Sequence, residues 1–217
     1  MPSLQHRGVS LVELLVGLAL GLFIVAIATS LLVARLQSHR ELLLQSRLMQ
    51  DLRVAADIVA RDLRRAGYWG EAGAASATRA NPYTALTVDA PGSESIGFRY
   101  SRDEHEDHGV DANEQFGFRL HEGVVEMLLG GRWQALTDSS TMTVTAFSIT
   151  PELQEITLEG FCATPCPPPS TDCPPRQLVR SLAVSISGRA ATAAALVRTV
   201  RSHVRLRNDP VVGQCVH

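Results

Sequence analysis

One carboxylate stands alone in a long apolar segment near the start of the chain. Glu13 is the only charged residue between Arg7 and Arg35. An ionised carboxylate inside a membrane helix costs about 2.5–3.5 kcal/mol on insertion scales, so it normally has a charged partner. Cleavage between Gly8 and Val9 would create an α-amine about 6 Å along a helix from Glu13. This offset suits a pair between Glu13 and the amine of a neighbouring, axially shifted subunit better than a pair within one chain.

The apolar segment is long enough to cross a membrane as a helix. Residues 9–34 exceed the roughly 20 residues that span the hydrocarbon core. A secretory signal peptide has an apolar core of only about 7–15 residues with a small-residue cleavage site after it. Gly17 and Gly21 form a small-xxx-small pair, which favours close helix packing in a membrane. We therefore expect a leader at residues 1–8 and a transmembrane helix at residues 9–34. An ordinary signal anchor whose Glu13 reaches the membrane surface is the alternative.

The residues around the expected cleavage point resemble the start of a type IV pilin precursor. In that family a short leader ends in glycine, an apolar residue follows, and glutamate stands at the fifth mature position. Gly8 and Glu13 match this pattern, and Val9 stands where the family usually has phenylalanine. The resemblance implies cleavage after Gly8 and N-methylation of Val9 by a prepilin peptidase. It also implies a structural subunit with no cofactor.

The helical pattern continues beyond the membrane segment. Apolar residues recur at spacings of three and four, which places them on one face of an α-helix; they are Leu48, Leu52, Ala55, Val59, Leu63 and Ala66. No proline interrupts this stretch, and Gly67 is suited to the left-handed position after a helix. The pattern predicts one helix from Val9 to Ala66, whose residues 35–66 are amphipathic and pack against a head domain.

Residues 67–217 form the predicted head, which is rich in short β-strands. Residues 71–82 are small and polar and read as a loop. The pair Gly130-Gly131 is a hairpin signal, and a change of alternation near Ala146 indicates a β-bulge. The predicted strands are at residues 96–100, 116–120, 124–129, 132–136, 142–149, 182–186 and 200–206. Strands packed on one long helix give an α+β fold, type IV pilin-like, with an antiparallel β-sheet head.

Two further segments indicate which class of type IV pilin the chain resembles. Arg61–Gly70 resembles the end of the N-terminal helix in PilW-like minor pilins, where Tyr68 and Trp69 would anchor that helix end under the sheet. Val204–Asn208 resembles the last strand of PilW and of J-type minor pseudopilins of type II secretion. The resemblance implies a minor pilin that takes part in priming of assembly or in a tip complex. A J-type pseudopilin is the alternative, and a membrane-anchored periplasmic enzyme is a second one.

The same resemblance implies the partners and the location of the chain. A minor pilin contacts other minor pilins, the major pilin, the prepilin peptidase and the inner-membrane assembly platform, and it lies in the lipid bilayer before assembly. We expect a cytoplasmic leader, a single inner-membrane span and a periplasmic head that later joins a pilus used in twitching motility.

Four cysteines, Cys162, Cys166, Cys173 and Cys215, lie in the region expected to be exported. Oxidising compartments favour disulfides, and the spacing lacks the paired short motifs of zinc sites. Four cysteines allow three pairings. We favour a bond from Cys215 to one of the loop cysteines, with the other two closing a local loop.

The remaining polar clusters give weaker signals. The densest acidic stretch, residues 103–114, has oxygen ligands that suit calcium, but its spacing departs from the calcium-loop pattern, so we expect a solvated loop without metal. The formal net charge is −2 and no basic cluster dominates, which argues against nucleic-acid binding. The chain has no nucleophile elbow, phosphate loop or metalloprotease helix, so we expect no enzymatic activity.

Overall fold

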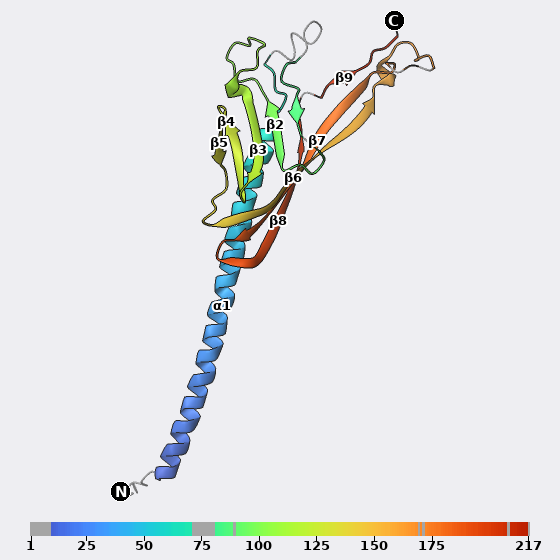
Figure 1. Cartoon of the computed structure of the whole chain (residues 1–217). Helices are drawn as coiled ribbons and strands as arrows, with labels where there is room; N and C mark the ends of the chain where they lie inside the picture. The colour runs from blue at the N-terminus through green and yellow to red at the C-terminus, as the bar shows by residue number, and fades with distance from the viewer. Residues whose placement is uncertain are drawn as a thin grey trace, which may run out of the picture. The chain divides into compact units, whose positions relative to one another are not determined.

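A single long helix precedes two antiparallel sheets in the computed structural model, which describes residues 10–70, 81–88, 90–168, 170, 172–207 and 209–216 (Figure 1). The helix α1 runs from Leu11 to Leu63 and contains 53 residues. The described chain divides into two compact units at the boundary between Ser46 and Arg47. The N-terminal half of the helix belongs to the first unit. The C-terminal turns of the helix and the β-rich head form the second unit.

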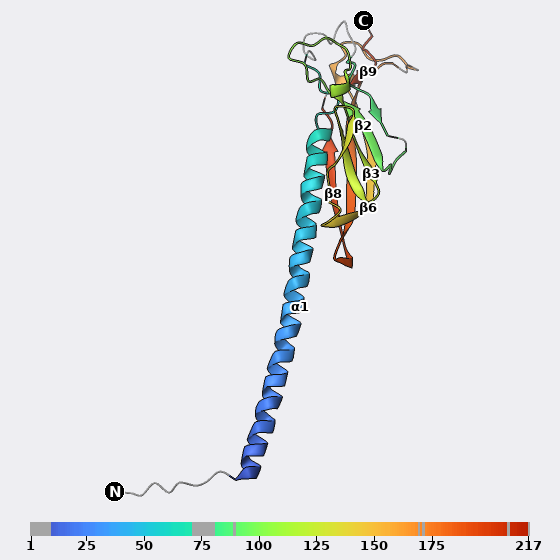
Figure 2. The ribbon, with the colours of Figure 1, turned by 60° about the vertical axis from the view of Figure 1, so that its left-hand side comes forward.

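The head-bound part of α1 buries one face against the sheets (Figure 2). Its buried side chains are Leu48, Leu52, Ala55, Ala56, Val59, Ala60 and Leu63. The predicted three-and-four spacing is therefore confirmed in this unit. Leu52 is fully buried, and a Cβ on Gly188 of the central strand would lie 3.1 Å from its Cδ2 atom. The glycine thus allows the helix to approach the sheet closely.

The end of α1 differs slightly from the prediction. The helix ends at Leu63, three residues before Ala66, and residues 64–67 form turns. Gly67 has a φ of +77° and donates its backbone N–H to the carbonyl of Arg99 at 2.8 Å. It therefore stops the helix in the left-handed conformation, as predicted. The predicted anchoring by Tyr68 is wrong, because this side chain is 46 % exposed, whereas Trp69 is buried.

The first sheet is an antiparallel meander of five strands in the order β1-β2-β3-β4-β5. The strands are β1 (Leu86–Thr87), β2 (Ser95–Arg99), β3 (Gln115–His121), β4 (Val124–Leu129) and β5 (Arg132–Ala135). Both Gly130 and Gly131 have positive φ, which confirms the predicted tight hairpin between β4 and β5. Stacked rings fill the core of this sheet; they are Phe98, Tyr100, Phe116 and Phe118.

The second sheet contains the longest strands. It consists of β6 (Met142–Thr157), β7 (Arg176–Ala190) and β8 (Ala193–Arg205), with the short β9 (Val211–Val212) beside the start of β7. The predicted bulge near Ala146 is present between β6 and β7.

The single sheet expected from the sequence is therefore two sheets, and β6 and β7 extend well beyond their predicted ends. Pro151 obscured the length of β6 in the sequence, because proline normally signals a break. It is tolerated here because β6 is an edge strand, in which a missing N–H need not weaken the sheet. The predicted loop at residues 71–82 lies mostly outside the described residues.

Candidate functional site

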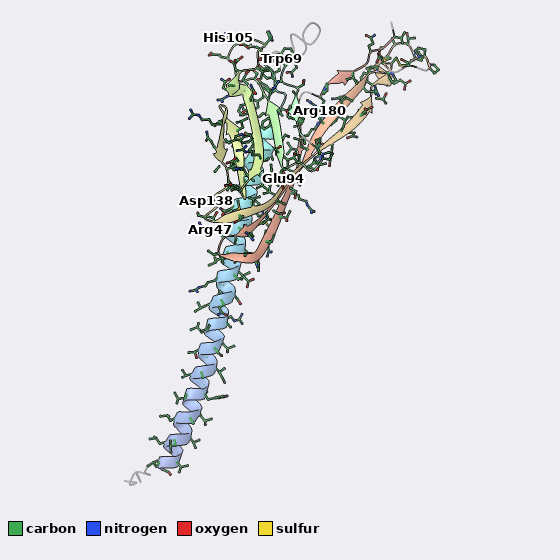
Figure 3. All side chains as sticks on the ribbon, viewed as in Figure 1. Arg47, Trp69, Glu94, His105, Asp138 and Arg180 are labelled. Atoms are coloured by element: carbon green, nitrogen blue, oxygen red, sulfur yellow. A yellow bond between two sulfur atoms is a disulfide. The ribbon has the colours of Figure 1, made fainter. Side chains whose placement is uncertain are left out.

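Glu13 lies in the first turn of α1. The side chains of this half of the helix point outward all around it (Figure 3). Every large apolar side chain from Leu11 to Leu36 is between 44 % and 77 % exposed. Of the described part of the chain, α1 is the one helix long and apolar enough to cross a membrane. It is therefore consistent with a single-pass anchor.

Thr29 and Ser30 of this segment are satisfied within the helix, whereas Glu13 has no partner among the described residues. The hydroxyl of Thr29 donates to the carbonyl of Val25 at 2.8 Å, and that of Ser30 donates to Ile27 at the same distance. Within the described range, Glu13 has no hydrogen bond or ion pair. A helix N-terminus favours a carboxylate by its dipole, but only by about 0.3–1 kcal/mol. A burial of Glu13 in lipid or among helices thus calls for an external positive group.

The neighbouring residues of the expected assembly site are only partly described. Gly8 and Val9, the expected cleavage pair, lie outside the described residues. A Cβ on Gly17 or on Gly21 would meet no atom within 4 Å, so this face of α1 has no packing partner in its own unit. The two glycines are four residues apart and therefore lie on the same helix face.

The sequence comparison identifies the family. The family model described as prepilin peptidase-dependent protein B matches residues 41–206, which is most of the chain. The chain belongs to this family. The match begins after the apolar segment, so it is independent of the motif at Gly8, Val9 and Glu13. Neither a curated protein nor a solved structure matches the chain.

The description of the family implies that its members are processed by a prepilin peptidase. The pilin-like layout of α1 on antiparallel sheets agrees with this assignment. The family thus accounts for the fold and for the enzyme that acts on the chain, while the choice of cleavage point rests on the N-terminal residues themselves.

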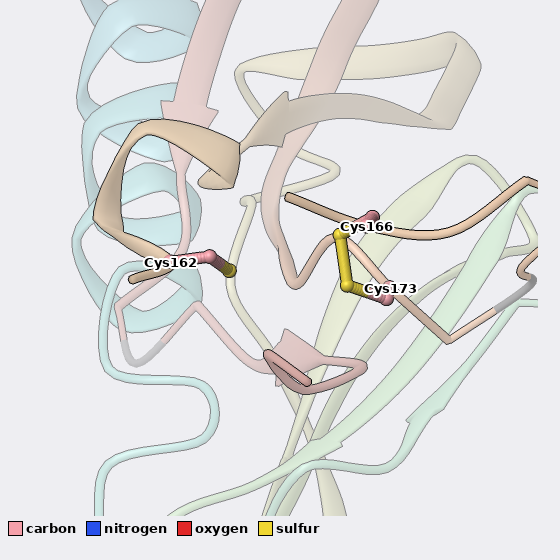
Figure 4. A group of neighbouring side chains, drawn as sticks. All are labelled: Cys162, Cys166 and Cys173. Atoms are coloured by element: carbon pink, nitrogen blue, oxygen red, sulfur yellow. A yellow bond between two sulfur atoms is a disulfide. The ribbon is translucent and has the colours of Figure 1, made fainter. Parts of the chain in front are cut away.

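Two disulfides constrain the β6–β7 connection of the head: one closes a loop within it (Figure 4), and the other ties it to the C-terminal tail. Cys162 is bonded to Cys215 with a Cα–Cα distance of 5.3 Å, and Cys166 to Cys173 with a Cα–Cα distance of 5.5 Å. These pairs agree with the arrangement favoured from the sequence. All four cysteines are used, so the cluster of Cys162, Cys166 and Cys173 offers no free thiolate to a metal.

The acidic loop is more ordered than the sequence suggested. Glu114, expected to be solvated, is fully buried and accepts hydrogen bonds from the backbone N–H groups of Arg102 and Asp111, both at 2.9 Å. The hydroxyl of Tyr83 lies 3.2 Å from the Glu114 carboxylate and 2.8 Å from that of Glu106. Burial, followed by the hydrogen bond to Glu106, raises the pKa of Tyr83. Glu114 therefore holds the loop onto the head.

The signal for this role was present in the sequence as Asp111-Ala-Asn-Glu114, a capping box at the start of a short 3₁₀ helix (Ala112–Glu114). Next to it, carboxylate oxygens of Asp103, Glu106 and Asp107 approach within 4.8 Å of one another. Burial, with the nearby Glu114 and Asp107 carboxylates, raises the pKa of Asp103. The structure thus gathers these acids at one end of the loop.

Proposed function

We propose that the chain is a minor pilin of the type IV pilus, cleaved between Gly8 and Val9 and N-methylated on Val9. The observation that carries the proposal is Glu13, a carboxylate without a partner among the described residues, in an exposed apolar helix of a prepilin peptidase-dependent family. Membership of a prepilin peptidase-dependent family supports a leader that this enzyme removes. Cleavage at this point would supply the positive group that the carboxylate lacks.

Glu13 would act when subunits assemble. In the bilayer its cost is offset once the methylated amine of an adjacent subunit approaches it from an axially shifted position. The face that contains Gly17 and Gly21 would let a second helix approach closely. These contacts would join the chain to other minor pilins and to the major pilin, during priming of assembly or in a tip complex.

The proposed location follows from the apolar half of α1 and from the head. The leader would face the cytoplasm, the apolar half of α1 would span the inner membrane, and the head would lie in the periplasm until the pilus is assembled. Two disulfides in the head support an oxidising compartment. The role is that of a structural subunit, handled by the prepilin peptidase and the assembly platform, and we propose no catalytic activity.

The processing step is tested by intact-mass analysis of the chain recovered from sheared pili. The expected mass corresponds to a chain that begins at methylated Val9. A mature chain that retains Met1, or that begins beyond residue 30, would contradict the proposal.

The role of Glu13 is tested by Glu13→Ala, with Glu41→Ala as the matched control, because Glu41 is an exposed acid on the same helix. We expect Glu13→Ala to insert in the membrane normally but to lose most co-purification with other pilins. Unchanged co-purification would contradict this role and would mean that the Glu13 carboxylate only extends to the membrane surface.

A deletion strain separates the pilus from the type II secretion system, in which the chain would be a J-type pseudopilin. Loss of surface pili and of twitching supports the minor pilin. Exoproteins trapped in the periplasm, with pili intact, would support the secretion system instead.

A further inference from the structure

The outer edge of β6 changes from covered to open at Pro151. Before this residue, Ile149 donates its N–H to the carbonyl of Ser93 and accepts from the N–H of Gly92, both at 3.0 Å. Ile149 therefore points its backbone groups away from β7. Because strand residues alternate in direction, the backbone groups of Leu153, Glu155 and Thr157 point the same way. Even-numbered residues face β7, as the bond from Leu158 to the carbonyl of Pro175 shows.

The open part of this edge, Leu153–Thr157, is named here the edge segment. Its outward backbone groups have no backbone partner in the part of the chain that the structure describes. Strand β7, in contrast, is paired on both sides, by β6 on one edge and by β8 and β9 on the other. Figure 1 shows β6 and β7 continuing together past the five-stranded sheet. The edge segment is thus accessible to a strand from another molecule.

The edge segment has little of the usual protection of a sheet edge. Natural edges are blunted by charged side chains, lysine above all, and by proline, bulges or a covering element, and of these the segment contains only the charge of Glu155. Here Pro151 lies before the segment, no bulge interrupts it, and its apolar side chains Leu153 and Ile156 are 59 % and 41 % exposed. Such a row of free N–H and C=O groups with exposed apolar side chains is a template for strand addition.

The charge of the strand indicates the chemistry of the partner. Strand β6 contains two acids, Glu152 and Glu155, and no basic residue. Their contacts with His203 and Arg176, at 2.8 and 3.2 Å, are between exposed side chains, and such pairs contribute at most about 1 kcal/mol. Glu159 adds a third acid directly after the strand. A partner strand with basic side chains would therefore be attracted to this edge.

The two disulfides constrain the chain that follows the edge segment. Cys166–Cys173 closes the connection between β6 and β7, and Cys162–Cys215 attaches the tail that includes β9. A binding edge that is already ordered loses less conformational entropy when a ligand binds.

We propose that the edge segment binds, by β-strand addition, an extended segment of a different protein in which an aliphatic residue is followed by a basic one and this pair recurs after one further residue. This interaction goes beyond the minor-pilin role and does not depend on which machine contains the chain. The apolar side chains of the partner would cover Leu153 and Ile156, and its basic side chains would approach Glu152 and Glu155.

The probe is a labelled nine-residue peptide with the sequence of Val197–Arg205, because this sequence has the required pattern and forms a strand in the same sheet. Its control has glutamate in place of the three arginines. Binding to the full chain in detergent micelles is measured by fluorescence anisotropy. We expect the basic peptide to bind at least tenfold more tightly than the acidic one. Equal binding of the two peptides, or no binding of the basic peptide at millimolar concentration, would overturn the proposal.

The variant Leu153→Pro removes one outward N–H without removing a bond to β7, so it should weaken peptide binding at least tenfold. Gln154→Ala on the same strand is the matched control and should bind normally. Because Leu153→Pro also changes the backbone of the hairpin, hydrogen exchange of the unmutated chain provides an independent measurement.

We expect saturating peptide to slow exchange at least tenfold at the amides of Leu153, Glu155 and Thr157, and to leave Thr150 unchanged because its N–H already faces β7. Unchanged exchange at the three outward amides would exclude strand addition. Slower exchange with increasing concentration of the chain alone would assign the edge to a second copy, and slower exchange with phosphatidylglycerol vesicles would assign it to a lipid surface. Either result would overturn the proposed partner.

Discussion

A single buried carboxylate organises one end of the head. The buried carboxylate of Glu114 is bonded to two backbone N–H groups and lies beside one hydroxyl, in place of water. Both of its oxygens therefore have hydrogen bonds that compensate for its burial. The arrangement also fixes Tyr83, which bridges Glu114 and the carbonyl of Gly109. The acidic loop is therefore attached to the head by hydrogen bonds, together with an edge-on ring contact between His108 and Trp69.

Replacement of Glu114 by alanine should destabilise the head strongly. The change leaves the N–H groups of Arg102 and Asp111 without their acceptor, and an unsatisfied buried donor costs about 1–3 kcal/mol. We expect a loss of about 3 kcal/mol in the free energy of unfolding, measured by urea denaturation of the full chain with fluorescence of the buried Trp69. Glu104→Ala, on an exposed residue of the same loop, should change it by less than about 0.5 kcal/mol. Similar losses in both variants would contradict the role of Glu114.

Tyr83 should make the head sensitive to alkaline pH. Its pKa is raised in the folded state above the ordinary value of about 10. Above that pH the unfolded chain has lost the phenolic proton while the folded chain retains it, so unfolding releases a proton. The stabilisation is complete below about pH 10 and falls as the pH rises further.

The variant Tyr83→Phe should remove most of this decrease, at the cost of about 1 kcal/mol at neutral pH for the lost hydrogen bonds. A smaller slope should remain, because burial also raises the pKa of Tyr100. Urea denaturation between pH 8 and 11 provides the measurement, with Tyr68→Phe on an exposed tyrosine as the control. An identical slope in Tyr83→Phe and the unmutated chain would show that Tyr83 does not titrate on unfolding.

At the scale of elements, α1 packs closely on β7 where Leu52 meets Gly188. Leu52→Ala should lower the free energy of unfolding of the head by about 2–5 kcal/mol, because a fully buried leucine leaves a cavity beside Gly188. Leu43→Ala is the matched control, because Leu43 is 70 % exposed and belongs to the other unit. It should leave the Trp69 unfolding transition unchanged. A shift of that transition in Leu43→Ala would mean that the two units unfold together.

Elements with a strong local pattern were predictable from the sequence, and those that depend on distant contacts were not. The spacing from Leu48 to Leu63 requires a helix, and Gly130-Gly131 requires a tight turn, because each is decided by residues close in the sequence. The distal half of β6 lacks such a pattern, since its residues 151–157 are all exposed and only pairing with β7 makes them a strand. The separation into two sheets likewise depends on distant pairing.

The candidate sites follow the same division. Glu13 was recognisable because a lone charge in an apolar run is a local feature. The burial of Glu114 was not, because its depth is created by Tyr83 and by the fold of the loop around it. The edge segment also requires the structure, since Pro151 is compatible with an edge strand but does not show which part of that edge is open.

At the scale of the whole molecule, the two parts of the chain suit different surroundings, an apolar one for the N-terminal part of α1 and water for the head. The part of α1 before Arg47 exposes apolar side chains that suit lipid or other helices, whereas the head buries its apolar face by itself. The family match at residues 41–206 covers mainly the head. Stability of the head and assembly through the helix should therefore respond to different substitutions.

The disulfides provide the last prediction, because they stabilise the head through the unfolded state. Cys162–Cys215 joins residues 53 apart and Cys166–Cys173 joins residues 7 apart. In the chain-entropy model the longer loop contributes about 4 kcal/mol and the shorter about 2 kcal/mol. Replacing Cys162 and Cys215 by serine should thus lower the free energy of unfolding about twice as much as replacing the other pair, in urea denaturation followed by Trp69 fluorescence. Equal losses would contradict the loop-length explanation and point instead to local contacts around each bond.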